Sequence, residues 1–387
     1  MTTRDSLLAD LAQLDAGGLR RTPRRVRGPQ GPEIEVDGRR AINFSSNNYL
    51  GLADHPALRA AALRATEVEG FGAAASRLIS GNLEAHRDLE QRLASWQGTE
   101  AALLFNSGYQ ANVGILSALA GPEDAIISDR LNHASLIDGA RLARAPVSVV
   151  PHRDLGGFER ALRAARGARR RFLVTDSFFS MDGDRAPIAA IGELAHAHDA
   201  LFLVDEAHAV GIFGPSGRGL GATLPIDLRM GTFGKAFGGF GAFVAADAQL
   251  IQLLTNQARS FVFTTALPVP VVAWARAAID LVSGPAGDER RARLASLVDR
   301  FCSGLRALGL PAPDQPGHVV PLIVGDARRT MALSEALLAR GVFAQGVRPP
   351  TVAPGTSRLR FALMATHRDD HIDAALDALH ALRRELP

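Results

Sequence analysis

The alternation of apolar and polar segments between about residues 40 and 275 restricts the fold more than any other feature of the chain. Short apolar runs, which predict buried strands, alternate with stretches of helical periodicity. The expected strands are 102–105, 125–128, 172–176 and 201–205, and the expected helices are 83–96, 111–119 and 188–198. Strands that are apolar throughout are buried on both faces, and their alternation with helices is typical of a largely parallel sheet. We therefore expect an α/β fold.

Three parts of the chain differ in this pattern. Residues 1–45 predict an N-terminal arm with a short amphipathic helix and then the basic stretch 19–27. Residues 46–275 carry the alternation and predict a large domain. Residues 276–387 predict a smaller α+β domain, and 387 residues are more than one typical domain holds. The elements expected in the smaller domain are strands at 319–324 and 359–363 and helices at 331–340 and toward the C-terminus.

Charge and cysteine content narrow the classes of function. The chain has 43 basic and 40 acidic residues, and arginine is spread among the acids without interleaved aromatics, which argues against nucleic-acid binding. The single cysteine, Cys302, excludes an internal disulfide and favours a reducing cytoplasm. The charged N-terminus lacks the apolar core of a signal peptide. The apolar stretch 266–282 is interrupted by Pro268, Pro270 and Arg276, so no segment predicts a membrane span.

Lys235 is the only lysine, and every other basic position that could be lysine is arginine. Only an amine with a reachable deprotonated form can attack a carbonyl and form a Schiff base; a guanidinium cannot. Lys235 lies in the glycine-rich segment 231–239, where small neighbours allow a flat ring to approach and Thr232 could bind a phosphate. A phosphate-binding P-loop is not expected, because Ala236 stands where that motif needs Ser or Thr. The alternative is chance survival of one lysine in an arginine-rich chain.

Polar residues follow the expected strands, where ligands bind in parallel sheets. Asp205 ends the run 201–205, and a partly buried aspartate there could keep a pyridine nitrogen protonated. His208 could then hydrogen-bond the phenolic oxygen of the same ring. The alternative is an aspartate that caps the next turn.

Other candidates are weaker when taken one at a time. Gly108 and Tyr109 open a helix whose free N–H groups suit a phosphate, and Tyr109 could stack on a ring. His133 could stack over a pyridine face, or it is a solvated loop histidine. Ser180 follows a strand, or it is an ordinary loop serine. Arg360 alternates with apolar residues on a short strand, which suits a carboxylate anchor, or it is a surface arginine.

The order of these features resembles the α-oxoamine synthases, a family of the fold type I superfamily of pyridoxal 5'-phosphate (PLP) enzymes. The resemblance runs from the segment Asn-Phe-Ser-Ser-Asn-Asn-Tyr-Leu-Gly-Leu at 43–52, through the lysine loop, to Arg360. Segments 129–136 and 346–352 are most similar to the members that condense L-alanine with a pimeloyl thioester, a step of biotin biosynthesis. The resemblance implies a mostly parallel large domain, a smaller α+β C-terminal domain, PLP as cofactor and a homodimer.

The resemblance also implies roles for individual residues, and it implies no metal. Lys235 would be the Schiff-base lysine, Asp205 the partner of the pyridine nitrogen, and His133 the stacking residue; with His208 these are the catalytic residues. The cofactor contacts would be Gly108, Tyr109, His133, Ser180, Asp205, His208, Thr232, Lys235 and Thr264. Of these, Thr264 would reach the phosphate of a neighbouring subunit. The substrate contacts would be Arg20, Asn47, Thr351 and Arg360.

Two departures from the family bear on the acyl substrate. Segment 72–76 is poorer in glycine than usual, and Phe240 is bulky for its position after the lysine loop. Glycine C-acetyltransferase, 5-aminolevulinate synthase and serine palmitoyltransferase therefore remain alternatives, as does a non-catalytic PLP-fold protein that binds a partner. The basic stretch 20–27 is a solvated arm or a landing site for an acidic carrier protein or the phosphates of CoA. A dinucleotide-binding enzyme is not expected, because no G-x-G-x-x-G follows the first strand.

Overall fold

The computed structural model describes residues 2–386, which form two compact units. Unit 1 contains residues 2–47, 180–184 and 292–386, and unit 2 contains residues 48–179 and 185–291. This division differs from the expected arm, large domain and small domain. The N-terminal segment belongs with the C-terminal one, and the second boundary falls inside helix α11 (Pro285–Ala307) rather than near residue 275.

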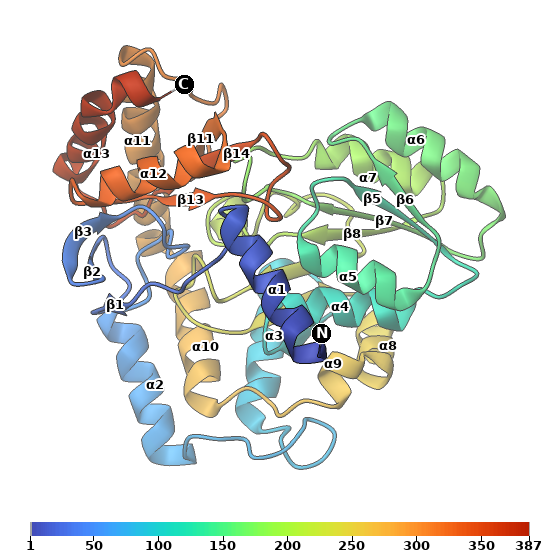
Figure 1. Ribbon diagram of the computed structural model, residues 1–387. Coiled ribbons are helices and arrows are strands. Elements are labelled where there is room, and N and C mark those ends of the chain that lie inside the picture. The colour runs from blue at the N-terminus through green and yellow to red at the C-terminus, as the bar shows by residue number, and fades with distance from the viewer. Residues whose placement is uncertain (1, 387) are drawn as a thin grey trace. The chain divides into compact units, whose positions relative to one another are not determined.

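Unit 2 is built on a seven-stranded sheet of order β4-β10-β9-β8-β7-β5-β6 (Figure 1). The strands are β4 (Ala101–Phe105), β5 (Ala125–Asp129), β6 (Val147–Val150), β7 (Arg171–Asp176), β8 (Leu201–Asp205), β9 (Leu228–Thr232) and β10 (Ala242–Ala246). Within this sheet β10 runs antiparallel to both its neighbours, and the other pairs are parallel. The largely parallel sheet is therefore confirmed, and the four expected strands are β4, β5, β7 and β8.

Helices cover both faces of this sheet. The helices of unit 2 are α2 (Pro56–Glu69), α3 (Glu84–Gln97), α4 (Gly108–Leu119), α5 (Ala134–Ala143), α6 (Leu155–Ala164), α7 (Ile188–Ala197), α8 (Ala248–Gln257), α9 (Arg259–Val262) and α10 (Val269–Ser283), with short 3-10 turns at Ala165–Gly167 and Pro215–Gly217. Successive residues of β8 face opposite ways: Leu203 packs in the core under α4 and α5, and Phe202 and Val204 pack under α6 and α7. Asp205 therefore points to the same face as Leu203, toward α4.

Unit 1 joins the two ends of the chain through its strands. β3 (Arg39–Asn43) pairs in parallel with β12 (Val342–Phe343) in the sheet β1-β2-β3-β12, which is why the N-terminal segment belongs to this unit. A second, antiparallel sheet has the order β11-β14-β13. The remaining elements are β1 (Val26–Arg27), β2 (Glu33–Val36), β11 (Val319–Gly325), β13 (Gln345–Val347), β14 (Ser357–Ala362), α1 (Thr3–Ala16), α12 (Ala327–Leu338), α13 (Asp369–Ala381) and a 3-10 turn at Arg383–Glu385. Within residues 2–386 no helix combines the length and the apolar character that crossing a membrane requires.

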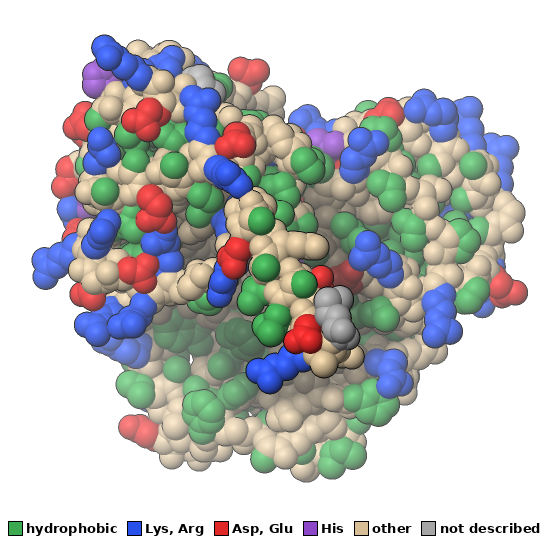
Figure 2. Space-filling view, viewed as in Figure 1, with side chains coloured by type: hydrophobic (Ala, Val, Ile, Leu, Met, Phe, Trp, Pro, Cys, Tyr) green, Lys and Arg blue, Asp and Glu red, His purple; other side chains and the backbone are tan. Residues whose placement is uncertain are grey.

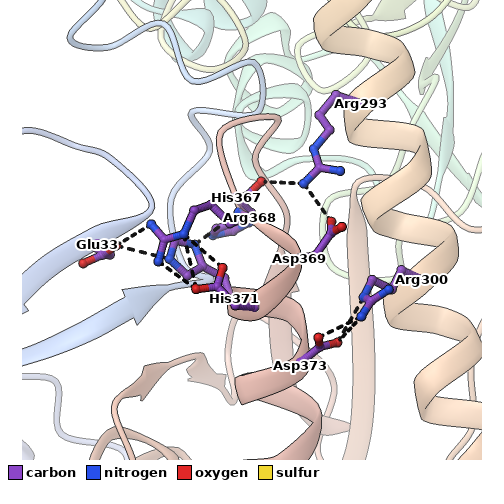
Figure 3. Close-up of polar contacts among 9 residues, drawn as sticks. Glu33, Arg293, Arg300, His367, Arg368, Asp369, His371 and Asp373 are labelled. Carbon is purple, nitrogen blue, oxygen red and sulfur yellow. Dashed lines mark hydrogen bonds and ion pairs between the residues drawn. The ribbon is translucent and has the colours of Figure 1, made fainter.

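A group of ion pairs ties α13 to its neighbours in unit 1 (Figure 3). Arg293 and Arg300 of α11 bind Asp369 and Asp373, at 2.8 and 2.7 Å. Figure 3 also shows Arg368 reaching Glu33 of β2, at 2.8 Å. Such exposed pairs each contribute little to the stability of the protein.

His367 lies buried beside this group, with its ring 4.6 Å from the ring of Phe44. Its Nδ1 accepts the Met364 N–H at 3.1 Å, so the proton of the neutral ring is on Nε2, which donates to the Asn43 carbonyl at 3.1 Å. Burial lowers the pKa of His367 from 6.5 to about 3. The folded protein therefore holds this imidazole in its neutral form.

We expect this histidine to make the protein less stable in mild acid. Between pH 6.5 and about pH 3 the unfolded chain binds a proton at His367 and the folded protein does not, so the free energy of unfolding falls as the pH is lowered. The slope from this group approaches about 1.4 kcal/mol per pH unit. Urea denaturation at pH 7 and pH 5 should show a smaller loss for His367→Gln than for the wild type. The exposed His380→Gln is the control; equal losses in all three proteins would contradict the assignment.

Candidate active site

The carboxylate of Asp205 is buried at the carboxyl end of β8, with only 3% of the residue exposed. One oxygen accepts the Nδ2 amide of Asn112 of α4 at 2.7 Å, and the other accepts the N–H of Ala207 at 2.8 Å. Asp205 therefore caps the following turn, as the alternative interpretation expected, and is also held by α4. Two donors on a buried carboxylate stabilise its charged form.

His133 sits just before α5 and is connected to Asp205 through side chains. The Asn112 amide that binds Asp205 also donates to Oγ of Ser135 at 2.9 Å. Oγ of Ser135 lies 2.7 Å from Nδ1 of His133, and the Ser135 N–H points to the same atom at 3.3 Å. Nδ1 is thus an acceptor and the proton of the neutral ring is on Nε2. Burial, and secondarily the charge of Lys235, lower the pKa of His133, while Asp205 opposes them.

Lys235 follows β9 in a tight loop. The Gly238 N–H donates to the Lys235 carbonyl at 2.9 Å. The Thr232 hydroxyl donates to the Gly241 carbonyl at 2.8 Å and accepts the Gly234 N–H at 3.1 Å. The Thr232 hydroxyl therefore donates its only proton to the Gly241 carbonyl within the loop. It could donate to a phosphate only if that hydrogen bond were broken.

The charge of Lys235 reaches two groups at the edge of the sheet. It contributes to the lowered pKa of His133, and it opposes the rise that burial causes in the pKa of Asp176, the last residue of β7. Lys235 thus lies among the side chains that follow β5, β7 and β8. On the same side His208 is buried, with its Nδ1 2.8 Å from the hydroxyl of the buried Tyr49.

The start of α4 has the properties of an anion site. Ser107 caps the helix by accepting the Gln110 N–H at 3.2 Å, while the N–H groups of Gly108 and Tyr109 have no acceptor among residues 2–386. Free N–H groups at a helix N-terminus bind phosphate well. Nearby, Asn106 at the end of β4 donates to the Thr264 hydroxyl at 3.4 Å. Gly108 and Thr264 therefore lie at one end of the same strand.

Tyr109 is about half exposed, and its hydroxyl donates to Asp138. This hydrogen bond raises the pKa of the Tyr109 phenol. The ring therefore has a fixed partner at its tip, and its face stays available for the stacking that the sequence predicts.

Three of the residues predicted from the sequence meet in unit 1. The buried Arg360 donates through Nε to the Ser180 carbonyl at 2.7 Å and through Nη2 to the Asn47 amide oxygen at 3.1 Å. Ser180 contributes its backbone to this contact. The arrangement orients the guanidinium of Arg360 from two sides.

The other two predicted residues of unit 1, Arg20 and Thr351, line a cavity of about 940 Å³. Arg21 rather than Arg20 contacts Thr351, with Nη2 3.3 Å from its hydroxyl. Arg348 also lines the cavity, is only 8% exposed, and has no acceptor for its Nε. Within residues 2–386 neither Arg21 nor Arg348 has a carboxylate partner, and burial lowers the pKa of Arg348. The cavity therefore offers positive charge to an anionic ligand.

The rest of the basic stretch is largely neutralised by acids. Arg20 pairs with Asp15 at 2.8 Å, and Arg24 pairs with Asp37 and Glu335. Figure 2 likewise shows acidic side chains among the arginines over the part of the surface that carries α12 and α13. These pairs favour the interpretation of the stretch as a solvated arm.

The segment poor in glycine, 72–76, contains a strained residue. Ala74 has a φ of +53°, where its Cβ crowds the backbone at a cost of about 1–2 kcal/mol. Part of this returns as the greater freedom of glycine in the unfolded chain, so we expect Ala74→Gly to stabilise the protein by up to about 1 kcal/mol. Thermal denaturation should show a higher midpoint. The neighbouring Ala75 does not have a positive φ, so Ala75→Gly should instead destabilise the protein. Equal effects of the two substitutions on the midpoint would contradict the prediction.

Sequence reasoning missed several polar residues of unit 2. Asn112 and Ser135 join Asp205 to His133, and Tyr49 holds His208. They lie within helices or far along the chain, and nothing in the local pattern marks them. Asp176 had a usable signal, because it ends a buried strand in the same way as Asp205.

Comparison with known proteins identifies the family to which the chain belongs. The family model of class I and II aminotransferases matches residues 39–379. An 8-amino-7-oxononanoate synthase from Geobacter sulfurreducens is 49% identical, over 98% of each chain. A serine palmitoyltransferase structure from S. paucimobilis, with PLP and myriocin bound, superposes with a TM-score of 0.92 at 31% identity, covering 98% of this chain and 97% of that one.

A solved 8-amino-7-oxononanoate synthase from Francisella tularensis is also similar, with a TM-score of 0.77 at 26% identity over 89% of this chain and 98% of that one. The match to the family model covers well over half of the sequence, and the curated relatives are similar over nearly its whole length. These findings confirm the resemblance drawn from the sequence. The chain belongs to the class I and II aminotransferase family and, within it, to the 8-amino-7-oxononanoate synthases.

Proposed function

We propose that this protein catalyses the decarboxylating condensation of L-alanine with a pimeloyl thioester to give 8-amino-7-oxononanoate, a step of biotin biosynthesis, with PLP as its cofactor. One observation supports this above the others. The only lysine lies among His133, Asp176 and Asp205 at the carboxyl edge of the sheet, in a chain similar over its whole length to 8-amino-7-oxononanoate synthases.

The residues of unit 2 fit PLP. The unpaired N–H groups of Gly108 and Tyr109 suit its phosphate, and the buried carboxylate of Asp205 suits a protonated pyridine nitrogen. Lys235 supplies an amine for the aldehyde, and the neutral ring of His133 is a flat surface for stacking. When bound, PLP supplies an electron sink for the charge that develops on the amino acid.

Each side chain then has a defined task. The amine of Lys235 removes the α-proton of alanine and later returns a proton. Asp205, held by Asn112, would supply the carboxylate that faces the pyridine nitrogen. His133 carries a proton on Nε2, which it can donate to an oxygen of the acyl group, and His208 is held by Tyr49 to contact the ring oxygen of the cofactor.

We propose that unit 1 supplies the substrate contacts. Arg360, oriented by Asn47 and Ser180, suits the carboxylate of alanine. A pimeloyl thioester also ends in a carboxylate. The cavity lined by Arg20 and Thr351 suits that end, because Arg21 and Arg348, which also line it, have no carboxylate partner among residues 2–386. This charge distinguishes a pimeloyl donor from acetyl or palmitoyl donors, whose ends are apolar.

We further propose that the protein works in the cytoplasm as a homodimer, with Thr264 reaching the phosphate in the neighbouring subunit. The acyl group arrives on CoA or on an acyl carrier protein. Turnover measured with pimeloyl-CoA and with the pimeloyl carrier protein decides between the two carriers, and sedimentation of the PLP-loaded protein tests the dimer.

A visible spectrum of the PLP-loaded protein, followed by amino-acid titration, tests the proposed function. We expect a spectral shift with L-alanine and little with glycine or serine. Carbon dioxide should then be released with a pimeloyl thioester and not with acetyl-CoA, succinyl-CoA or palmitoyl-CoA. A glycine-specific shift with acetyl-CoA turnover would instead identify glycine C-acetyltransferase, and binding of PLP without turnover of any pair would identify a non-catalytic protein.

A further inference from the structure

Two carboxyl groups lie side by side at the edge of the sheet in unit 2. β7 and β8 are parallel and in register, and Asp176 pairs with Asp205 at their carboxyl ends. Paired residues on neighbouring strands point to the same face, and the strands are about 4.8 Å apart. Asp176 is 4% exposed and Asp205 is 3% exposed. The fold thus buries two acids next to each other.

The two carboxyl groups have different partners. Asp205 accepts hydrogen bonds from Asn112 and from the Ala207 N–H. Within residues 2–386 Asp176 accepts a single one, from the backbone N–H of His133 at 2.8 Å. Asp205 is therefore the better stabilised of the two as an anion.

Adjacent buried carboxyl groups do not both ionise readily, so the pair favours a single negative charge. Burial, and then the charge of Asp205, raise the pKa of Asp176 well above its ordinary value, and Asp129 of β5 acts in the same direction. The His133 N–H and the charge of Lys235 oppose this rise. The proton of the pair therefore resides on Asp176.

Asp176 also fixes the loop that carries His133. The side chain of Asn132 donates to the Val174 carbonyl at 2.9 Å and accepts the Asp176 N–H at 3.1 Å. The next residue, His133, donates its own N–H to the Asp176 carboxyl group. The end of β7 thus holds this loop at two consecutive residues.

We propose that Asp176 is a positioning residue that acts in its neutral, protonated form, holding the backbone of His133 while the negative charge of the pair stays on Asp205. A charged Asp176 would stabilise the ammonium of Lys235 and keep that amine protonated, and a protonated amine cannot remove a proton. A neutral Asp176 does not stabilise the ammonium in this way. This inference rests on the proposed function only for the tasks of His133, Asp205 and Lys235.

Two substitutions separate the neutral form from the charged one. Asp176→Asn keeps the shape and an oxygen that accepts the His133 N–H, but it cannot carry a charge. We expect it to retain about a third or more of kcat/KM with an unchanged pH profile, whereas Asp176→Ala should lose about tenfold, the scale of one buried hydrogen bond. A loss in Asp176→Asn as large as in Asp176→Ala would overturn the proposal.

Infrared spectroscopy tests the proton directly and needs no turnover. In the full-length protein, with PLP bound and after its removal, we expect a carboxylic C=O band at neutral pH that Asp176→Asn abolishes. Burial also raises the pKa of Glu206 to about 7, so Glu206→Gln is the matched background in which the band must persist. An unchanged band in Asp176→Asn would overturn the proposal even if the protein proved to have another activity. If the alanine variant fails to fold, the kcat/KM and pH profile of Asp176→Asn and its infrared band still decide.

Discussion

Replacing Lys235 with alanine is expected to lower turnover by a factor of at least about 10⁴, the scale seen when a covalent catalyst is removed. The chain has no second lysine that could take over the chemistry, which is rarely true of a protein this long. Borohydride treatment of the PLP-loaded wild type should attach the cofactor to the peptide that contains Lys235, and mass spectrometry should find no such adduct in Lys235→Ala.

Lys235→Arg is the matched control for the loss of charge. It keeps a cation near Asp176 and His133 but lacks an amine that can attack a carbonyl. We expect it to be as inactive as Lys235→Ala, while thermal denaturation shows both variants folded. Substantial turnover by the PLP-loaded Lys235→Ala protein would contradict the assignment of Lys235.

The parts of the fold that could be predicted are those whose burial leaves a simple pattern. β4, β5, β7 and β8 are buried on both faces over most of their length, and each therefore contains a run of at least three apolar residues. β9 is equally central, but it contains Arg229, whose buried guanidinium donates to the carbonyls of Gln97 and Leu224. Its pattern is broken by a polar residue with partners elsewhere in the chain, so sequence periodicity does not reveal it.

Division into units was harder to predict, because it depends on pairing between distant segments. β3 and β12 pair although almost the whole chain separates them in sequence, and the apolar pattern of neither strand indicates this pairing. The same difficulty applies to residues whose role depends on a contact with a distant side chain, because the sequence does not show the contact. Asp205 and Lys235 could be found because their chemistry is distinctive and they follow strands, whereas Asn112 binds Asp205 from a position 93 residues away. Arg21, not Arg20, contacts Thr351. The sequence alone could not separate the two, because neighbouring arginines look alike in sequence.

Replacing Asp205 with asparagine should give the second largest loss, roughly 10²–10³-fold in kcat, the range for removing one preorganised electrostatic contact. An amide cannot keep a pyridine nitrogen protonated by charge. In either orientation its NH₂ would also face a donor, the NH₂ of Asn112 or the N–H of Ala207, both of which now donate to the carboxylate. Asp205→Glu, which keeps the charge, is the control and should lose less. The loss is measured as kcat and as the pH dependence of the cofactor absorption.

Because Asp176 lies next to Asp205, the Asp205→Asn variant also tests the proposed pair of carboxyl groups. Removing the charge of Asp205 takes away one of the causes that raise the pKa of Asp176, so Asp176 should ionise more readily in this variant and supply part of the missing negative charge. The double variant Asp205→Asn, Asp176→Asn should therefore lose more activity than the product of the two single losses, since residues in one network are not independent. Strictly multiplicative losses would show that Asp176 does not compensate for the lost charge of Asp205.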